Sequence, residues 1–233
     1  MHNKELFFRP GCRVLVIGSS GAIGSALVAN LRQMVRSRDV ITISRQKDGL
    51  DFMHPNTIAL DSVGQDGPFQ LILDATGALD INNAGPEKSV SSLDYDVMLN
   101  QFKVNTIGPA LLIKQLMNFL PRTGKAVFVT LSARVGSIED NRLGGWISYR
   151  ASKAALNQVI KTASIEASRK NPQSLFMAIH PGTVKSKLTE KYLGNHKFVQ
   201  PAEAAKNILQ VIEQKGPGDT GGFYAFDGQK IPY

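Results

Sequence analysis

The sequence is short of the residues that mark several classes of protein. Its 233 residues include one cysteine, Cys12, so no disulfide can form within the chain, and no cluster of cysteines and histidines suggests a zinc site. No apolar stretch approaches the roughly eighteen residues needed to cross a membrane. Residues 1–10 form a polar arm without the apolar run of a signal peptide. These absences predict a soluble, cytoplasmic protein with no metal centre.

Charge is unbalanced but not clustered. The chain has 27 Lys and Arg residues against 19 Asp and Glu residues, a formal net charge of +8, which suits an anionic ligand or an acidic surface. No run of basic residues is longer than two, and the aromatic residues, at 7%, are not interleaved with basic clusters. We therefore expect neither nucleic acid nor a membrane as a partner, although a basic nucleic-acid binder stays as a third interpretation.

What the chain does contain is a repeated alternation of apolar strands and amphipathic segments. Hydrophobic residues make up 42% of the chain, enough for one substantial core, and no repeat or linker divides it. This pattern predicts a single doubly wound α/β domain over residues 1–233, a Rossmann fold with sheet order 3-2-1-4-5-6-7 and its site at the carboxyl ends of the strands. The expected strands are 13–17, 40–44, 57–60, 69–73, 126–131, 175–179 and one within 221–233.

A glycine-rich turn follows the first expected strand and leads into a helix that reaches about Arg36. Glycine lets the backbone approach a pyrophosphate there, and unpaired amides with the positive end of the helix meet its charge. A tight turn without a ligand is the alternative. The candidate cofactor-binding residues of this turn are Gly18, Ser19, Ser20, Ala22, Ile23 and Gly24.

The end of the second expected strand indicates which dinucleotide binds. Ser44 and Arg45 stand where an acidic residue would bind the 2′-hydroxyl of NAD, whereas a guanidinium pairs with a 2′-phosphate. The sequence therefore favours NADP(H) over NAD(H), with a solvated charge as the alternative for Arg45. Asp61 and Ser62, after the third expected strand, are predicted to lie near the adenine.

The segment 146–157 carries the reactive pair. It has strong helix formers and no interior Gly or Pro, so Tyr149 and Lys153, four residues apart, share one helix face. A fixed ammonium favours the phenolate, which predicts a lowered pKa for Tyr149 and a role as proton donor and acceptor near neutrality. The spacing alone is weak evidence and needs a cofactor site elsewhere in the chain.

With these motifs together, the chain resembles the short-chain dehydrogenase/reductase family over nearly its whole length. Gly18 and Gly24 supply the family's Gly-x-x-x-Gly-x-Gly turn, with Ala22 at the middle position, and Tyr149 and Lys153 match its Tyr-x-x-x-Lys. The resemblance implies an NADP(H)-dependent enzyme that interconverts a carbonyl (aldehyde, ketone or quinone) and an alcohol by hydride transfer. Tyr149 would give the proton, and Lys153 would bind the nicotinamide ribose.

Two further residues complete the relay that the resemblance implies. Asn105, in the helical segment 93–120, would hold the helix open around a water beside the lysine, with a purely structural hydrogen bond as the alternative. Ser132, at the end of the fifth strand, would steady the substrate oxygen. Alignment on the next glycine puts Ala133 at the usual serine position, and Ser137 is a second candidate.

The resemblance also assigns the rest of the cofactor site. The fourth strand is followed by Ala75, Thr76 and Gly77, which would form the floor of the cofactor site. The family string Asn-Asn-Ala-Gly at 82–85 does not follow a strand directly, so it is predicted to be a surface loop. After the sixth strand, His180 is expected to be packed rather than catalytic. The turn expected to face the nicotinamide consists of Pro181, Gly182, Thr183 and Val184.

The remaining expectations concern the substrate side. Residues 185–200, which include Lys185, Lys187, Lys191 and Lys197, are predicted to form a solvated lid over the substrate. The alternative is that these lysines attract an acidic substrate or the cofactor phosphates. The segments 131–138, 144–146 and 221–233 look most like the branch with C-factor-like proteins and sniffer-type carbonyl reductases. A nucleotide-binding regulator on the same scaffold is the alternative. Family relatives often pair through the helices of 93–120 and 146–168, so the resemblance implies a homo-oligomer, a dimer or a tetramer, with a monomer as the alternative. The substrate stays open.

Overall fold

A parallel sheet forms the centre of the molecule. The computed structural model describes residues 7–8, 11–57, 60, 63–186, 189–192 and 198–233, and within these residues the sheet has six strands in the order β2-β1-β3-β4-β5-β6. All its neighbouring strands pair in parallel. The strands are β1 (Val14–Ile17), β2 (Val40–Ile43), β3 (Leu71–Asp74), β4 (Ala126–Leu131), β5 (Ser174–His180) and β6 (Gly222–Ala225). The predicted doubly wound α/β fold is confirmed.

One expected strand is not among these six. The strand predicted at 57–60 includes residues 58 and 59, which lie outside the described residues, and Thr57 ends a 3-10 helix that begins at Pro55. When that strand is left out of the predicted order and the remaining strands are renumbered, the predicted order is the same as the observed one. The final strand, expected within 221–233, is β6.

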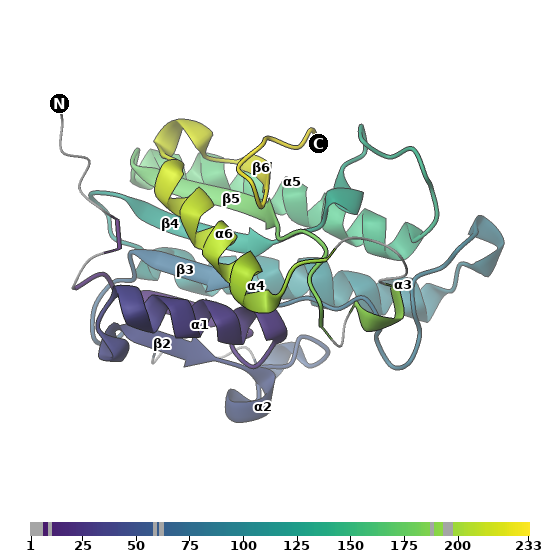
Figure 1. Cartoon of the computed structure of the whole chain (residues 1–233), viewed down its shortest axis with the longest axis horizontal. Helices are drawn as coiled ribbons and strands as arrows, with labels where there is room; N and C mark the ends of the chain where they lie inside the picture. Colours follow the sequence, from purple (N-terminus) through teal and green to yellow (C-terminus); the bar gives the residue numbers. More distant parts are fainter. Residues whose placement is uncertain (1–6, 9–10, 58–59, 61–62, 187–188, 193–197) are drawn as a thin grey trace.

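Helices cover both faces of the sheet. Figure 1 shows α1 and α6 across the near face, with α5 behind the strands. The helices are α1 (Ala22–Met34), α2 (Arg45–Asp48), α3 (Tyr95–Phe102), α4 (Gly108–Leu116), α5 (Ile147–Lys170) and α6 (Pro201–Gln214). The 3-10 helices are Ser37–Asp39, Pro55–Thr57, Val90–Ser92, Met117–Phe119, Arg134–Gly136, Glu190–Tyr192 and Pro217–Asp219. No helix among the described residues combines the length and the apolar character that a membrane crossing requires.

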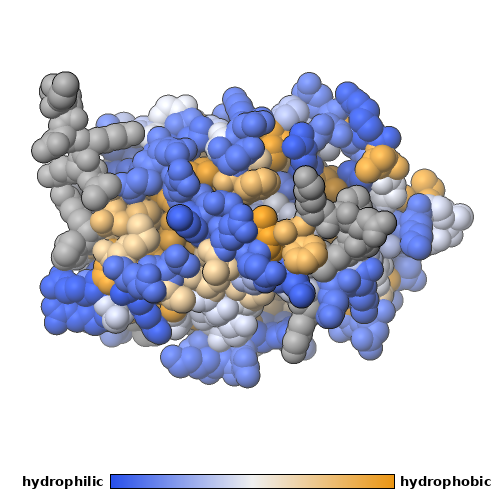
Figure 2. Space-filling model, viewed as in Figure 1, coloured by the Kyte–Doolittle hydropathy of each residue, from blue (hydrophilic) through white to orange (hydrophobic). Residues whose placement is uncertain are grey.

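Alternation along the strands explains the two layers. In β1, Val14 and Val16 pack with α1 and α6 in one buried cluster, whereas Leu15 and Ile17 pack with α4 and α5 in the other. Side chains that alternate between two apolar faces are typical of parallel strands covered on both sides. Figure 2 shows the near face as mostly hydrophilic, with apolar side chains between the helices in patches.

The helical segment predicted at 93–120 is interrupted. After α3, residues Lys103–Ile107 form a π-helical turn, and α4 follows directly. The irregular turn comes just before Gly108 and Pro109. Gly108 is needed because a Cβ there would collide with the ring of Phe52. Inserted π-turns occur frequently at functional sites, and this one contains Asn105.

Candidate active site

The glycine turn after β1 packs tightly against the neighbouring strand ends. The backbone N–H groups of Gly18 and Ser19 donate to Ile43 O at 2.9 and 3.1 Å. Gly18 has φ +79°, and a Cβ at this position would lie 2.9 Å from the carbonyl of Ala75. A Cβ on Gly24 would collide with Gly18 O. Only glycine allows the backbone to fold this closely at both positions.

The first turn of α1 presents backbone donors. Its N-cap, Gly21, is extended, and no side chain caps the helix. The amides of Ala22 and Ile23 at the start of a helix have no acceptor within it, and the helix dipole adds partial positive charge. Ser20 is exposed beside them. These backbone donors fit a pyrophosphate. Ala22, which stands where the family has a glycine, is the first residue of α1 and does not disrupt the turn.

The end of β2 carries the residues expected to select NADP(H). Ser44 is the N-cap of α2: its Oγ accepts Lys47 N at 3.1 Å, and its own N–H donates to Asp48 Oδ2 at 2.8 Å. Arg45 follows as the first residue of α2, with an exposed side chain. A guanidinium at this position is free to meet a phosphate. Asp61 and Ser62 lie outside the described residues.

The end of β3 forms the floor of the site. The buried carboxylate of Asp74 accepts Thr76 N at 3.0 Å and Thr130 Oγ1 at 2.8 Å, which joins the ends of β3 and β4. Gly77 has φ +139°, and a Cβ there would lie 3.2 Å from both Asn105 Oδ1 and Lys153 Nζ. A side chain at position 77 would crowd Asn105 and Lys153, so this position favours glycine.

The family string at 82–85 lies away from this floor. Asn82 and Asn83 are exposed in the left-handed region, with φ of 52° and 63°, and Ile81 pairs with Ala84 around them. The string is thus a tight surface turn, as the sequence predicted. Asn and Asp tolerate left-handed backbone better than other non-glycine residues, which accounts for the pair at this position.

Asn105 links the π-turn to the floor. Its side chain is fully buried, with Oδ1 accepting Ala78 N at 2.9 Å and Nδ2 donating to Ala78 O at 2.9 Å and Gln101 Oε1 at 2.7 Å. The structural hydrogen bond that was the alternative for this residue is therefore present. It also fixes the chain directly after Gly77, so Asn105 shapes the space beside the lysine.

Tyr149 and Lys153 lie one turn apart on α5. Lys153 Nζ is 6.0 Å from the centroid of the Tyr149 ring and donates to Leu131 O at 2.9 Å. The lysine is buried, and this burial lowers its pKa to about 8, although the nearby carboxylate of Asp74 opposes the shift. Burial raises the pKa of Tyr149. The predicted lowering of the tyrosine pKa by the lysine is therefore wrong in direction, because desolvation by burial raises this pKa.

The two candidate serines have other partners. Ser132 is buried, and its Oγ donates to Asn157 Oδ1 at 2.7 Å. Ser137 is also buried, and its Oγ accepts Asp140 N at 3.1 Å. Among the described residues no hydrogen bond joins either serine to Tyr149. The structure thus brings together Tyr149, Lys153, Asn105 and Gly77, but it turns both serine hydroxyls elsewhere.

The turn after β5 is held by the segment that follows it. Val199 N donates to Thr183 O at 2.9 Å, and Val184 is buried beside Val199. Gly182 has φ +83°, which only glycine adopts readily. His180 Nδ1 is buried with no hydrogen-bond partner among the described residues, and burial lowers the His180 pKa to about 4. A histidine that stays neutral near pH 7 agrees with a packed residue.

The predicted lid is tied down by an acid that the sequence analysis missed. Asp80 accepts Lys191 Nζ at 2.8 Å and the hydroxyl of Tyr192 at 2.5 Å, over 111 and 112 residues of sequence. Burial, together with the bond to Asp80, raises the Tyr192 pKa to about 12. Lys187 and Lys197 lie outside the described residues. No local pattern in the sequence could have paired Asp80 with a lid residue so far along the chain.

An aromatic row joins Tyr192 to Tyr149 through Trp146. The Trp146 ring lies edge-on to Tyr192 at 5.4 Å and to Tyr149 at 6.2 Å between centroids. Such contacts add to burial in fixing ring positions. Trp146 is the single tryptophan of the chain. The row therefore links the 3-10 helix Glu190–Tyr192 to the start of α5.

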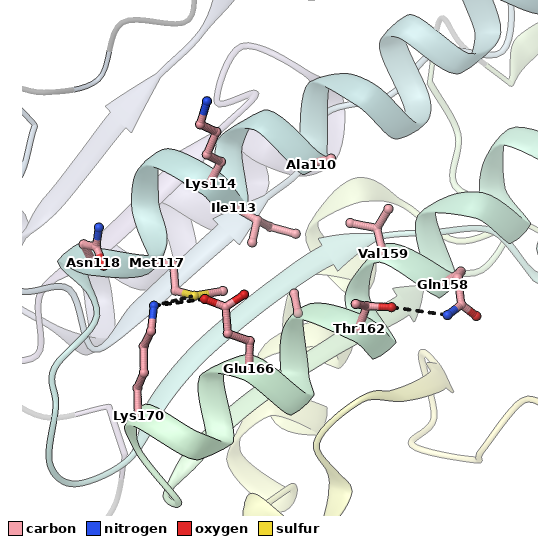
Figure 3. Close-up of a pocket in the computed structure, with 11 residues that line it drawn as sticks. Ala110, Ile113, Lys114, Met117, Asn118, Gln158, Val159, Thr162, Glu166 and Lys170 are labelled. Atoms are coloured by element: carbon pink, nitrogen blue, oxygen red, sulfur yellow. Dashed lines mark hydrogen bonds and ion pairs between the residues drawn. The ribbon is translucent and has the colours of Figure 1, made fainter.

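A separate groove lies between α4 and α5 (Figure 3). It has a volume of about 480 Å³ and is lined by side chains such as Ile113, Met117 and Val159, with an ion pair of 3.0 Å between Lys170 and Glu166 at one end. Its lining on α5 comes from residues 158–170, whereas Tyr149 and Lys153 are in the first two turns. The groove therefore does not include Tyr149 or Lys153.

Comparisons with known proteins agree with this geometry. Residues 12–196 match the family model for short chain dehydrogenase. The chain is 37% identical over 139 residues to a 1-hydroxy-2-glutathionyl-2-methyl-3-butene dehydrogenase of Rhodococcus sp. (strain AD45), with 60% of each protein covered. It is 28% identical over 165 residues to C-signal of Myxococcus xanthus, with 68% of this chain and 95% of that protein covered.

A solved structure is similar over the whole chain. The NADPH-bound carbonyl reductase from chicken fatty liver superposes with a TM-score of 0.81, at 23% identity, covering 100% of this chain and 97% of that one. At this identity the likeness concerns the fold alone. The family that the sequence motifs indicated is confirmed by the family model and by the relatives.

Proposed function

This chain belongs to the short chain dehydrogenase family, and from that premise we propose that it is an NADP(H)-dependent oxidoreductase that interconverts a carbonyl and an alcohol. One observation supports this most strongly. Tyr149 and Lys153 lie together at the carboxyl ends of β3 and β4, where ligands bind in doubly wound sheets. Neither a structural protein nor a simple binding module needs a tyrosine and a buried lysine at this position.

The residues of the glycine turn fit the proposed cofactor. The uncapped first turn of α1 would hold the pyrophosphate, and Ser44 and Arg45 would bind the 2′-phosphate. The turn 181–184 would face the nicotinamide, and Lys153 would bind its ribose. When bound, NADPH supplies the hydride for the carbonyl carbon. The NADPH found in the chicken carbonyl reductase supports this choice of cofactor.

In the reaction, the protein's own residues donate the proton that the alcohol oxygen receives. The raised pKa of Tyr149 keeps its hydroxyl protonated at neutral pH, so it can donate to the carbonyl oxygen as the alcohol forms. Lys153, with a pKa of about 8, is mainly charged at pH 7 and stabilises negative charge that develops on the tyrosine oxygen. A protonated tyrosine is the form that the reduction of a carbonyl requires.

The proposed function is tested by binding and turnover together. NADPH fluorescence is titrated with the purified protein, and NADPH oxidation is then followed with aldehydes, ketones, quinones and a glutathione-conjugated carbonyl. The last is included because of the Rhodococcus relative. We expect micromolar or tighter NADPH binding and turnover with at least one class of carbonyl. Failure to bind either NADPH or NADH would contradict the proposal.

Arg45→Ala is expected to weaken NADPH binding by about tenfold to a hundredfold, because a charge-assisted bond to the 2′-phosphate is lost. NADH has no 2′-phosphate, so its affinity should change less than twofold. Both dissociation constants are measured by fluorescence titration. Arg32→Ala, in the last turn of α1, is the matched control. Equal losses of affinity for NADPH and NADH would show that Arg45 does not bind the 2′-phosphate.

The serine position is tested by a pair of substitutions. Ser132→Ala should leave Asn157 Oδ1 without its donor and cost about 1–3 kcal/mol of unfolding free energy, with kcat within threefold of the parent. Ala133→Ser should raise kcat/KM for carbonyl reduction about tenfold, because it adds a donor at the family's serine position. Steady-state kinetics and thermal unfolding measure both. A large loss of kcat in Ser132→Ala would instead give Ser132 the catalytic role.

The second candidate function is a nucleotide-binding regulator of weak activity. Two observations favour it: Ala133 stands where the family more often has a serine, and C-signal is among the relatives. A regulator would bind NADPH tightly but turn over no carbonyl, and Tyr149→Phe would change nothing measurable. The binding and turnover assays above separate the two candidates.

A further inference from the structure

Glu87 is a buried carboxylate with no part in the functions assigned above. Its side chain is 6% exposed, and both carboxylate oxygens contact one residue at the start of α5, 61 positions further along the chain. Oε2 accepts Ser148 N at 3.1 Å, and Oε1 accepts the Ser148 hydroxyl. The backbone carbonyl of Glu87 also accepts Trp146 N. One residue thus holds three donors at this helix end.

The helix needs this external partner because its N-terminus lacks a favourable N-cap residue. Trp146, the N-cap of α5, has φ +54°, in the left-handed region that bulky side chains avoid, and no side chain of the local sequence caps the helix. Arg150 holds the preceding loop by donating to Gly144 O and Gly145 O. A carboxylate near the positive end of a 24-residue helix is also favourable.

Tyr149 follows Ser148 directly, so the same contacts fix the reactive residue. It is the third residue of α5, and its ring packs edge-on against Trp146. We propose that Glu87 is a positioning residue, which holds the first turn of α5 so that the Tyr149 hydroxyl points at the substrate oxygen. This role rests on the proposed oxidoreductase function. Glu87 acts through Ser148 and Trp146, and does not itself contact the substrate.

Glu87→Gln is the direct test. The amide keeps the size of the side chain but removes the negative charge at the start of α5, and its nitrogen can only donate, so the bond with the Ser148 hydroxyl must reverse its direction or break. We expect kcat for carbonyl reduction to fall tenfold or more, with the NADPH dissociation constant within twofold, because small misplacements of reacting groups are costly in rate. Glu203→Gln, at an exposed residue in the first turn of α6, should change neither quantity.

Tryptophan fluorescence gives a readout that does not depend on turnover. Trp146 is the only tryptophan, so its emission reports this helix start alone. In Glu87→Gln we expect a red-shifted emission maximum and at least twofold faster quenching by acrylamide, whereas Glu203→Gln stays like the parent. If Glu87→Gln does not fold, Ser148→Ala, which removes the hydroxyl bond and keeps the backbone bond, is measured in the same way and should shift in the same direction.

The outcomes separate this proposal from the proposed function. An unchanged kcat, or a loss of activity that only follows the loss of folded protein while Trp146 emission stays constant, would overturn the positioning role. Absence of turnover in the parent with every carbonyl would count against the proposed function. In that case the fluorescence of Trp146 in the two variants still decides whether Glu87 holds the start of α5.

Discussion

Replacing Tyr149 with phenylalanine is expected to lower kcat for carbonyl reduction by about three orders of magnitude, because proton transfer by a positioned side chain contributes about 10²–10⁴-fold. The substitution removes a single hydroxyl, and the remaining ring can still pack edge-on against Trp146. The NADPH dissociation constant should therefore stay within twofold. Steady-state NADPH oxidation and fluorescence titration measure the two quantities on the same preparation.

The matched control for this experiment is Tyr95→Phe. The Tyr95 side chain is 78% exposed at the start of α3, so loss of its hydroxyl should change neither kcat nor NADPH binding. No described residue makes a hydrogen bond with the Tyr149 hydroxyl, so Tyr149→Phe should melt within a few degrees of the parent. A variant that retains a tenth or more of the parent kcat would rule out Tyr149 as the proton donor.

Six of the seven expected strands and the glycine turn could be predicted because their signals are local. Runs such as Val14–Ile17 are apolar on both faces, and this pattern fits a strand covered by two helix layers. The glycine turn was identified from its place between a strand and a helix. The position of residues 82–85 followed from the same argument, since a floor for the cofactor must stand at a strand's end. In each case neighbouring residues carry the whole signal.

The orientation of Ser132 was open in the sequence but follows from the sheet. Along β4, Val127, Val129 and Leu131 face the α1 and α6 layer, whereas Phe128 faces α5. Strand alternation continued by one residue puts Ser132 on the α5 side, where Asn157 accepts its hydroxyl. The sequence could not decide this, because the choice depended on how far the strand geometry extends.

Burial and distant contacts could not be predicted. The lysine four residues from Tyr149 was visible in the sequence, but the degree of desolvation was not, so the direction of the tyrosine pKa shift was predicted wrongly. The contacts of Asp80 with Tyr192 and of Glu87 with Ser148 join segments 112 and 61 residues apart. Such pairs follow from the tertiary fold, which brings Asp80 beside Tyr192 and Glu87 beside the start of α5.

Lys153→Met is expected to have opposite effects on activity and stability. The methionine matches the length of the side chain but carries no charge, so kcat should fall about a hundredfold or more with loss of the cation beside Tyr149. Because burial lowers the Lys153 pKa from 10.5 to about 8, the charged form destabilises the native state at pH 7. We expect removal of this charge to raise the unfolding free energy by about 1–3 kcal/mol. Loss of the hydrogen bond to Leu131 O offsets part of that gain.

The pH dependence of stability identifies the cause. Between pH 8 and 10.5 the unfolded chain holds the Lys153 proton while the native state has lost it, so the unfolded state binds more protons. This group's contribution to the unfolding free energy therefore rises with pH across that window and is constant below it. The parent should show this rise in denaturant titrations from pH 7 to 10, and Lys153→Met should lack it. Lys161→Met, at an exposed position of the same helix, should keep the parent's slope. Equal slopes in the parent and Lys153→Met would mean that the ammonium is solvated in the native protein, and the gain in stability would then have no electrostatic origin.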